Sequence, residues 1–426
     1  MYEISISEYG YIGCDGISTA KDKFIGDRNL EKALFQELYN YWLENKESQK
    51  VFSFENKNCL KATSYVGVIQ TKNLSIEILP KIYNQKNKLI TRNIFIEMLK
   101  PLFKINSLML KEANLSTVKN KNIYEIFISL FIESVDKLIH RGLKSHYHLT
   151  EANQYFLKGK LKFNQHIKEN FIHKERFFVE FDEYMQDRAE NRLIKSTILL
   201  LINKTKKYEN KKALRQQLFI FDDISLSNNY DRDIAQINLN RGMEHYETAL
   251  KFAKLFLKEN SFSSLRGDSN IFAILFSMEK VFENYIEFVL YNSRSILNIK
   301  KIVTNGYSGD YLLKNESSNL IGLEPDYLLE MEDGTKIITD AKWKLLEVNN
   351  NKIDISSSDA YQIFSYLHFY NAQNKAYIFV PRTSNNRDLE LNYNIKLSKK
   401  SIKIITIDIL EIIKNNHILK NNFFEN

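Results

Sequence analysis

The chain has 426 residues, of which 44% are hydrophobic and 26% charged, a length and composition typical of a protein of two or three domains. No apolar run approaches the roughly 18 residues of a membrane span, and the two cysteines exclude a disulfide framework or a cysteine-rich zinc site, so we expect a cytoplasmic protein with no membrane association. The formal net charge of +8 favours a polyanionic partner, above all nucleic acid, although a lysine-rich solvated surface would give the same charge.

Residues 1–90 alternate between apolar and polar side chains in the manner of β-strands. The alternation is clearest at residues 65–70 and 74–80, and Asn/Lys turns separate such segments. One helix is predicted within this region, at residues 29–45. We therefore predict a β-rich N-terminal domain over residues 1–90.

Residues 91–265 are predicted to form a mainly helical middle region, because their apolar side chains recur at helical spacing. Two long helices are expected at residues 187–205 and 241–259, while the basic stretch 156–163 could be extended. Residues 101–220 contain 22 Lys and Arg against 13 Asp and Glu, so this region carries the positive charge of the whole chain.

Several basic side chains of the middle region are candidate contacts to DNA phosphate or to an acidic partner surface, namely Lys158, Lys160 and Lys162. Arg188 and Arg192 lie four residues apart on a predicted helix and are candidates for the same role. The alternative is that these side chains belong to a solvated surface, and that Arg192 pairs with neighbours on the Glu190 or Asp187 side of its own surface.

The polar, glycine-containing segment 261–270 is a predicted linker. The predicted elements after it are a helix at 271–291, strands near residues 300, 325 and 337, a helix at 357–370 and a strand at 375–381. This order predicts a compact α/β domain over residues 266–426. The whole chain is thus predicted to be an α+β multidomain protein with a β-rich N-terminal domain, a helical middle region and a C-terminal α/β domain.

A candidate catalytic centre lies on a predicted hairpin of this last domain, whose strands at 325–331 and 336–342 are joined by an Asp-Gly turn. Side chains alternate along a strand, so Asp340 and Lys342 share one face, and pairing brings Asp326 close to them. Two carboxylates and an ammonium at the end of a buried hairpin need compensation, which Mg²⁺ with oxygen ligands supplies. Such a site suits phosphodiester hydrolysis, although a surface ion pair would show the same pattern.

The flanking helices offer further candidates. Glu283 could contribute another acidic ligand to the metal, or could be an ordinary surface residue. Gln362 and Tyr366 are one turn apart and could both reach a phosphate or the lysine, while core packing is an equal alternative for Tyr366. A helix, this hairpin, a further helix and an apolar strand are the parts of a PD-(D/E)xK nuclease core, which the region resembles.

Three other kinds of catalytic or nucleotide-binding motif are absent from the sequence. No G-x-x-x-x-G-K-[ST] loop is present, so the chain is not expected to bind a nucleotide through a phosphate-binding loop. Neither H-E-x-x-H nor G-x-S-x-G occurs, which excludes the common zinc-hydrolase helix and the nucleophile elbow. The acidic hairpin is left as the candidate catalytic centre.

The sequence resembles the McrC family, the nuclease subunits of McrBC systems that restrict DNA modified by 5-methylcytosine. The resemblance covers most of the chain and rests on SYVGVI at 64–69, IEILPKI at 76–82, LKGKL at 157–161, FDEY at 181–184, ENRLIK at 190–195, PD at 325–326 and TDAKWK at 339–344. It implies that Asp326, Asp340 and Lys342 are catalytic, with Mg²⁺ as cofactor and double-stranded DNA as substrate. It also implies a ring-forming AAA+ partner, McrB, which binds GTP and translocates, and into which the N-terminal half of this chain docks to stimulate GTP hydrolysis.

Two other functions are compatible with the same residues. One is a self-sufficient Mg²⁺-dependent nuclease whose basic middle region holds DNA. The other is a non-catalytic assembly subunit that only activates the GTPase of its partner, a hypothesis that the intact set of Asp326, Asp340 and Lys342 argues against.

Overall fold

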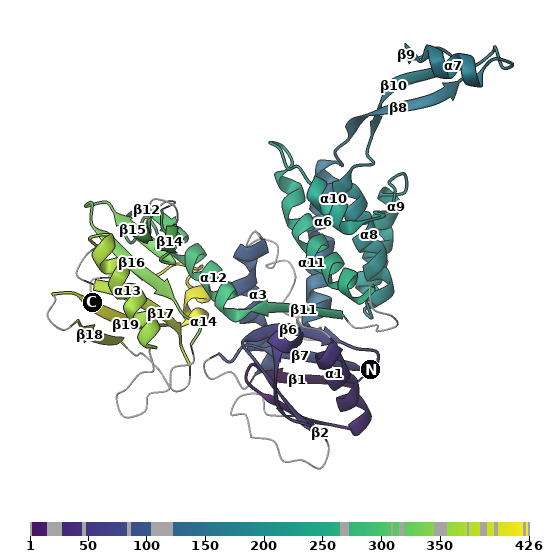
Figure 1. The fold of residues 1–426 in the computed structure, drawn as a ribbon. Helices are drawn as coiled ribbons and strands as arrows, with labels where there is room; N and C mark the ends of the chain where they lie inside the picture. The colour runs from purple at the N-terminus through teal and green to yellow at the C-terminus, as the bar shows by residue number, and fades with distance from the viewer. Residues whose placement is uncertain are drawn as a thin grey trace. The chain divides into compact units, whose positions relative to one another are not determined.

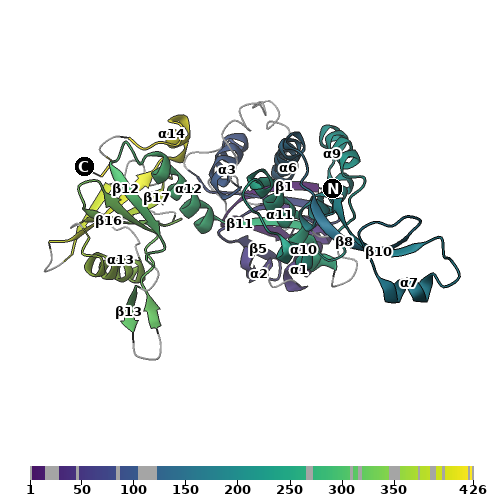
Figure 2. The same cartoon turned by 90° about the horizontal axis from the view of Figure 1, so that it is seen from above.

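The fold is described from a computed structural model, which shows a mixed α/β protein of several sheets and helices (Figures 1 and 2). The residues described are 2–14, 28–44, 48–82, 87–103, 122–264, 272–307, 310–314, 319–344, 356–372, 375–383, 390–395, 399–420 and 423–424. Among them, no helix combines the length and the apolar character that a bilayer crossing requires.

A four-stranded sheet is built mainly from the first eighty residues, in the order β1-β7-β6-β11. Its strands are β1 (Tyr2–Ser7), β6 (Tyr65–Gln70), β7 (Leu74–Leu79) and β11 (Phe272–Ser277). Strands β1 and β7 are parallel, and the other neighbours are antiparallel. The predicted strands at 65–70 and 74–80 are thus present and paired.

The predicted helix at 271–291 is wrong in its first part, because residues 272–277 form strand β11 and helix α12 begins at Met278 (Met278–Asn292). Strand β11 pairs with β6, and Gly67 permits the close approach, since a Cβ there would lie 1.9 Å from the carbonyl oxygen of Ile274. The apolar run FAILFS has no periodicity that separates a buried strand from a buried helix.

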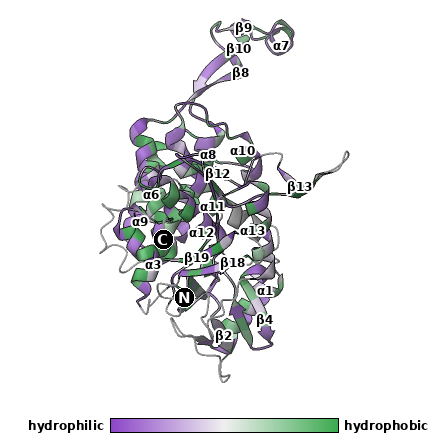
Figure 3. Cartoon of the chain, turned by 90° about the vertical axis from the view of Figure 1, so that its left-hand side faces the viewer, coloured by the Kyte–Doolittle hydropathy of each residue, from purple (hydrophilic) through white to green (hydrophobic). Residues whose placement is uncertain are grey.

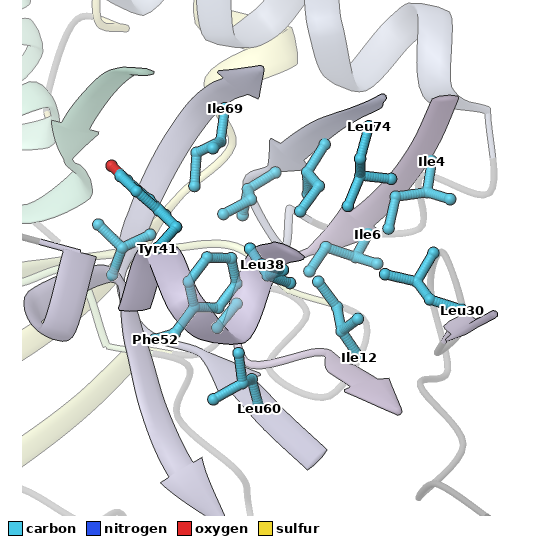
Figure 4. Close-up of a cluster of buried hydrophobic side chains, with 14 of the residues drawn as sticks. Ile4, Ile6, Ile12, Leu30, Leu38, Tyr41, Phe52, Leu60, Ile69 and Leu74 are labelled. Atoms are coloured by element: carbon cyan, nitrogen blue, oxygen red, sulfur yellow. The ribbon is translucent and has the colours of Figure 1, made fainter. Parts of the chain in front are cut away.

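A second sheet, β3-β2-β5-β4, lies beside the first and shares a hydrophobic core with it (Figure 4). Its strands are β2 (Tyr11–Cys14), β3 (Arg28–Leu30), β4 (Phe52–Asn56) and β5 (Cys59–Ala62), and the helices α1 (Lys32–Glu44) and α2 (Ser48–Val51) accompany them. Helix α1 corresponds to the helix predicted at 29–45. The core includes Ile6, Ile12, Leu38, Phe52, Leu60 and Leu74.

Helices dominate the middle of the chain, as the sequence predicts. They are α6 (Ile123–Arg141), α8 (Ala189–Lys204), α9 (Tyr208–Ile220), α10 (Tyr230–Gln236), the short 3-10 helix η1 (Glu244–Tyr246) and α11 (Glu247–Ser264). Helix α8 matches the prediction at 187–205 closely. Helix α11 extends to Ser264, so residues 261–264 of the predicted linker 261–270 are helical. The rest of that linker lies outside the described residues.

An arm projects from these helices (Figure 1). It consists of the strands β8 (His146–Gln154), β9 (Lys160–Leu161) and β10 (Phe177–Met185), in the sheet order β8-β10-β9, with helix α7 (Phe163–Glu169) between β9 and β10. No residue of α7 is buried. Hydrophobic residues occur on the arm among hydrophilic ones (Figure 3). Of the stretch 156–163, which could be extended, only Lys160 and Leu161 form a strand, β9, and Phe163 begins helix α7.

The C-terminal sheet has six strands in the order β12-β15-β16-β17-β19-β18. They are β12 (Ile299–Thr304), β15 (Tyr327–Met331), β16 (Lys336–Ala341), β17 (Lys375–Pro381), β18 (Glu390–Asn394) and β19 (Ser401–Ile407). The predicted hairpin is the antiparallel pair β15–β16, while β16, β17 and β19 run parallel to one another.

Helices α12, α13 (Ser357–Phe369) and α14 (Ile409–Lys414) and the hairpin of β13 (Tyr311–Lys314) with β14 (Asn319–Gly322) complete this part of the chain. Helix α3 (Lys88–Phe103), which follows the N-terminal sheets in the chain, packs on α12. Helix α13 packs on β16 and β17, and the predicted helix at 357–370 is therefore in place.

Contacts between residues divide the chain into two compact units. The first comprises Met1–Ser107, Ala113–Ile123 and Ser269–Asn426, and the second comprises Leu108–Glu112 and Tyr124–Asp268. The sequence-based division into 1–90, 91–265 and 266–426 follows the order of the chain. The structure instead groups the first and last of these regions, because strand β11 joins the N-terminal sheet and helix α3 packs on α12.

Candidate active site

The two strands of the β15–β16 hairpin bring Asp326 and Asp340 together. Tyr327 is paired with Thr339 in an antiparallel register, so the next pair toward the end of the hairpin is Asp326 with Asp340. Asp326 precedes the strand, and its Oδ2 accepts a hydrogen bond of 2.8 Å from the backbone amide of Ala341. The predicted convergence of the two carboxylates is thus present.

Asp340 is the more deeply buried of the two, with 1% of its surface exposed. The Lys342 Nζ lies 2.8 Å from its Oδ2 as an ion pair, and no other group among the described residues hydrogen-bonds to either carboxylate oxygen. A buried carboxylate whose oxygens lack part of their hydrogen bonds costs free energy. The arrangement is therefore one that a further cationic or hydrogen-bonding group would stabilise.

The pKa values of the site reflect the burial of several charges together. Burial and the neighbouring Asp340 carboxylate raise the pKa of Asp326 to about 7. Burial also raises the pKa of Glu283. For Lys342, burial acts to lower the pKa, but the carboxylates of Asp340 and Asp326 outweigh it and hold the pKa above the usual range. Perturbed carboxyl groups beside a lysine are typical of functional sites.

The donor set fits Mg²⁺, which binds through one or two protein carboxylates and keeps water or substrate phosphate as its other ligands. Asp340 supplies two buried carboxylate oxygens, and Asp326 lies close enough for the Asp340 charge to raise its pKa. Among the described residues, no three His, Cys, Asp or Glu side chains gather closely enough to hold a metal ion on their own. Glu283 lies in helix α12 and contributes its backbone oxygen to a 2.5 Å hydrogen bond from the Tyr327 hydroxyl, so its role as a metal ligand stays a prediction.

Gln362 and Tyr366 lie on helix α13, as predicted, and interact with each other. The Gln362 Nε2 donates to the Tyr366 hydroxyl at 2.7 Å. Tyr366 is buried in the core of the C-terminal sheet, and burial raises its pKa, with a further contribution from Asp340. Tyr366 thus packs in the core and also lies near the aspartate, so the two interpretations are compatible.

Lys158 and Lys162, two of the residues predicted to bind DNA, have partners on their own arm. Lys162 lies 2.7 Å from Glu151 and 2.9 Å from Glu180, and Lys158 lies 4.0 Å from the ring centre of Phe181. Lys160 is exposed in β9. These contacts give Lys158 and Lys162 structural roles in the arm, which the sequence spacing did not indicate.

Arg188 and Arg192 are also occupied by acidic neighbours. Arg192 donates to both carboxylate oxygens of Asp233, with Nη2 to Oδ1 at 2.9 Å, and Arg188 pairs with Glu190 at 3.2 Å. The local pairing of Arg192 that the sequence left open is present with Asp187 at 3.6 Å, but its nearer partner, Asp233, comes from helix α10.

Comparisons with known proteins place this fold. The family model described as McrBC 5-methylcytosine restriction system component matches residues 60–380. A chain of a refined half-complex from a tetradecameric assembly of Thermococcus gammatolerans McrB AAA+ hexamers with bound McrC is similar over 95% of this chain and 94% of its own, with 22% identity and a TM-score of 0.68. A chain of the Thermococcus gammatolerans McrBC complex, solved by cryo-EM, is similar over 68% of this chain and 88% of its own, with 24% identity and a TM-score of 0.52. No curated protein sequence matches.

The fold and the site define a multidomain α/β protein with two aspartates and a lysine gathered at the end of a buried hairpin. The chain belongs to the family of McrBC 5-methylcytosine restriction system components, whose model covers about three quarters of it. Its role therefore lies in a restriction system.

Proposed function

We propose that the chain is the DNA endonuclease subunit of a GTP-dependent restriction complex that acts on modified DNA, with a PD-(D/E)xK type site at Asp326, Asp340 and Lys342. The observation that carries the proposal is the buried Asp340 carboxylate, which pairs with Lys342, lies close to Asp326 and accepts no other hydrogen bond among the described residues. Replacing a buried ion pair by well-packed apolar residues is often neutral or stabilising, so stability alone gives little reason for this arrangement.

Asp326 and Asp340 would hold Mg²⁺, which when bound polarises the scissile phosphate and lowers the pKa of water. The chain's own contribution is positioning. The hydrogen bond from the Ala341 amide fixes the Asp326 carboxylate, and the Lys342 ammonium, kept protonated by its acidic neighbours, is placed to donate to a phosphate oxygen or to orient the attacking water. Glu283, close enough to feel the charges of Lys342 and Asp340, would add negative charge, and a carboxyl with a raised pKa can accept a proton.

The partner in this proposal is a ring-forming AAA+ GTPase of the McrB kind. The sequence contains no phosphate-binding loop of the Walker type, so GTP binding and hydrolysis would belong to the partner. A chain of similar fold occurs in an assembly of McrB AAA+ hexamers with bound McrC, and the similarity covers 95% of the present chain, which includes most of its middle region.

The arm is the surface proposed to contact this partner, instead of residues 1–90. Large apolar side chains are exposed along the arm, where an isolated protein would have little reason to keep them: Tyr147, Tyr155, Phe156, Leu157, Phe163, Ile167, Phe171 and Ile172. The N-terminal sheets, by contrast, bury most of their apolar residues in their own core.

The test is a reconstitution of the chain with an McrB-like GTPase, methylated plasmid DNA, GTP and Mg²⁺. Cleavage is expected only when all components are present, and Asp340→Ala or Lys342→Ala should abolish it while partner binding and GTP hydrolysis persist. Cleavage by the chain without partner or GTP would instead favour the self-sufficient nuclease. Full cleavage by Asp340→Ala would remove the assignment of the site, and stimulation of GTP hydrolysis without any cleavage by the wild-type chain would favour the non-catalytic subunit.

A further inference from the structure

A buried hydrogen bond connects the N-terminal sheet to the residue that directly follows Lys342. The indole Nε1 of Trp343 donates to both carboxylate oxygens of Glu8, at 3.1 Å to Oε1 and 2.9 Å to Oε2. Glu8 is fully buried and Trp343 is 4% exposed. The two residues are 335 positions apart in sequence, and neither was singled out from the sequence.

Glu8 itself is held firmly by the N-terminal sheet. It follows strand β1, its backbone amide donates to the Leu79 carbonyl at 2.8 Å, and its Oε1 accepts a 2.6 Å hydrogen bond from the Lys81 amide. The next residue, Tyr9, has a φ of 61°, which gives the chain a tight turn at this point. The carboxylate is therefore placed by the backbone of two neighbouring strand ends and has little freedom of its own.

Trp343 is placed on its other side by helix α12. Its ring contacts that of Phe282 edge to face, with a distance of 5.4 Å between ring centres, and Phe282 precedes Glu283. The backbone amide of Lys342, the preceding residue, donates to the Phe379 carbonyl at 2.9 Å. Trp343, just after strand β16, is thus held between the Glu8 carboxylate of the N-terminal sheet and helix α12, which carries Glu283.

The other tryptophan of the chain shows that an indole does not need a carboxylate. Trp42 donates from its Nε1 to the backbone carbonyl of Phe52 at 2.8 Å, and the two residues are only ten positions apart in sequence. A neutral carbonyl satisfies a buried N–H group without the desolvation cost of a buried charge. Trp343 instead donates to the distant, fully buried carboxylate of Glu8. The need of its N–H group for a hydrogen bond does not by itself explain this choice of acceptor.

We propose that Glu8 is a positioning residue of the nuclease site, which acts through the Trp343 indole to fix the end of β16 and hence the geometry of Asp340 and Lys342. This inference rests on the proposed function, because it concerns the same reaction. A consequence is that cleavage depends on the correct docking of the N-terminal sheet on the C-terminal sheet, so that a nuclease site detached from the N-terminal sheet is inactive. Displacement of reacting groups by about 1 Å can lower a rate roughly a hundredfold, which is the size of effect that such a contact can control.

The two tryptophans provide a matched test in the full chain with its GTPase partner. Trp343→Phe keeps the ring contact to Phe282 but removes the hydrogen bond to Glu8, whereas Trp42→Phe removes a hydrogen bond of similar length within the N-terminal core. Trp343→Phe should lower the single-turnover cleavage rate at saturating DNA by at least about tenfold and raise the half-saturating Mg²⁺ concentration, with DNA affinity unchanged. Trp42→Phe should leave cleavage and the Mg²⁺ requirement close to wild type, even if it lowers the Tm as much as Trp343→Phe does.

A second measurement does not depend on activity. Trp42→Phe leaves Trp343 as the single tryptophan, so its fluorescence emission reports the environment next to Glu8. Glu8→Gln, which keeps the size of the side chain and one acceptor oxygen, should shift this emission and also reduce the cleavage rate less than Trp343→Phe does. Mg²⁺ titration of the single-tryptophan protein should change the emission, and the Asp340→Ala variant should not respond.

The outcomes separate this inference from the proposed function. Equal cleavage rates and Mg²⁺ requirements for Trp343→Phe and Trp42→Phe would reject a positioning role for Glu8. The positioning role would also be rejected if the loss of cleavage in Trp343→Phe equals the fraction of that variant that is unfolded, and if cooling, which refolds it, restores cleavage fully. If Asp340→Ala cleaves DNA normally, the proposed nuclease site fails instead, whatever the tryptophan variants show.

Discussion

The Asp326 carboxylate accepts a 2.8 Å hydrogen bond from the Ala341 amide, and this bond joins the outer ends of strands β15 and β16. Ala341 stands between Asp340 and Lys342, so the bond holds Asp326 against the two residues with which it shares the site. Two carboxylates kept this close in a buried hairpin repel each other, and burial with this repulsion raises the pKa of Asp326 to about 7. The hairpin therefore stores unfavourable electrostatic free energy that a bound cation would release.

The first prediction is that, without metal, the stability of the protein falls as the pH rises. Asp326 has a folded pKa of about 7, above its ordinary value of 3.8, so the folded state binds more protons than the unfolded state between these values. The free energy of unfolding should then decrease from about pH 4 to pH 7, by at most about 4 kcal/mol. Asp326→Asn should flatten this decrease, raise stability at pH 8 and abolish cleavage.

Urea unfolding in EDTA at a series of pH values measures this effect. The matched control is Asp333→Asn in the turn of the same hairpin, where the carboxylate accepts hydrogen bonds from the amide and hydroxyl of Thr335, which lower its pKa. That variant should keep the pH dependence of the wild type and its cleavage activity. If Asp326→Asn instead loses stability at pH 8, the two aspartates do not repel each other as described.

The second prediction concerns Mg²⁺. Because Asp326 must lose its proton to bind a cation, affinity should fall as the pH drops below about 7. Calorimetric titration should show binding about tenfold weaker at pH 6 than at pH 8, with proton release at pH 6. Equal affinity at both values would show that Asp326 either is not a ligand or is already ionised at pH 6.

The third prediction tests the arm as the partner surface. Phe171, in the segment between α7 and β10, is 78% exposed, and Phe219 in helix α9 is 82% exposed, so neither contributes much to the core. Phe171→Ser should weaken partner binding and stimulation of its GTPase by about tenfold, as expected for an aromatic contact worth 1 to 2 kcal/mol. Phe219→Ser should change neither, and both should keep the wild-type Tm. Equal effects of the two changes would remove the arm from the interface.

The fourth prediction separates two lysines of the arm. Lys160 is exposed, whereas Lys162 forms ion pairs with Glu151 and Glu180. If the arm also contacts DNA, Lys160→Gln should flatten the dependence of DNA affinity on salt by about one phosphate contact, and Lys162→Gln should leave it unchanged. Lys162→Gln should instead make the arm more sensitive to limited proteolysis. A salt dependence that neither change alters would mean that DNA does not bind at this edge of the arm.

The fifth prediction follows from the grouping of distant segments. Co-expressed fragments of residues 1–123 and 269–426 should purify together, because β6 pairs with β11, Trp343 binds Glu8, and the His417 Nε2 lies 3.4 Å from a Glu97 oxygen. The fragment 266–426 on its own should aggregate or unfold at a lower urea concentration, since it loses all these partners. A stable, monomeric 266–426 fragment would show that the C-terminal sheet does not depend on the N-terminal one.

Local patterns in the sequence were enough to predict the hairpin and its acids. Period-two alternation and the Asp-Gly turn specify β15 and β16, and alternation alone places Asp340 and Lys342 on one face. Helices α8 and α13 and the strands β6 and β7 follow from the same kind of local periodicity. In each case the interactions that define the element lie within a few residues of one another, so the sequence contains them directly.

Only the tertiary structure decided where the remaining groups find their partners. The run FAILFS at 272–277 could be strand or helix by composition, and it is a strand because the backbone of β6, about two hundred residues earlier, offers an open edge at Gly67. Likewise, the charges of Lys162 and Arg192 were visible in the sequence, but their acidic partners come from other segments. Glu8 shows the limit most clearly: no local pattern marks it, and its carboxylate accepts the Trp343 indole N–H only because folding brings together two residues that are 335 positions apart.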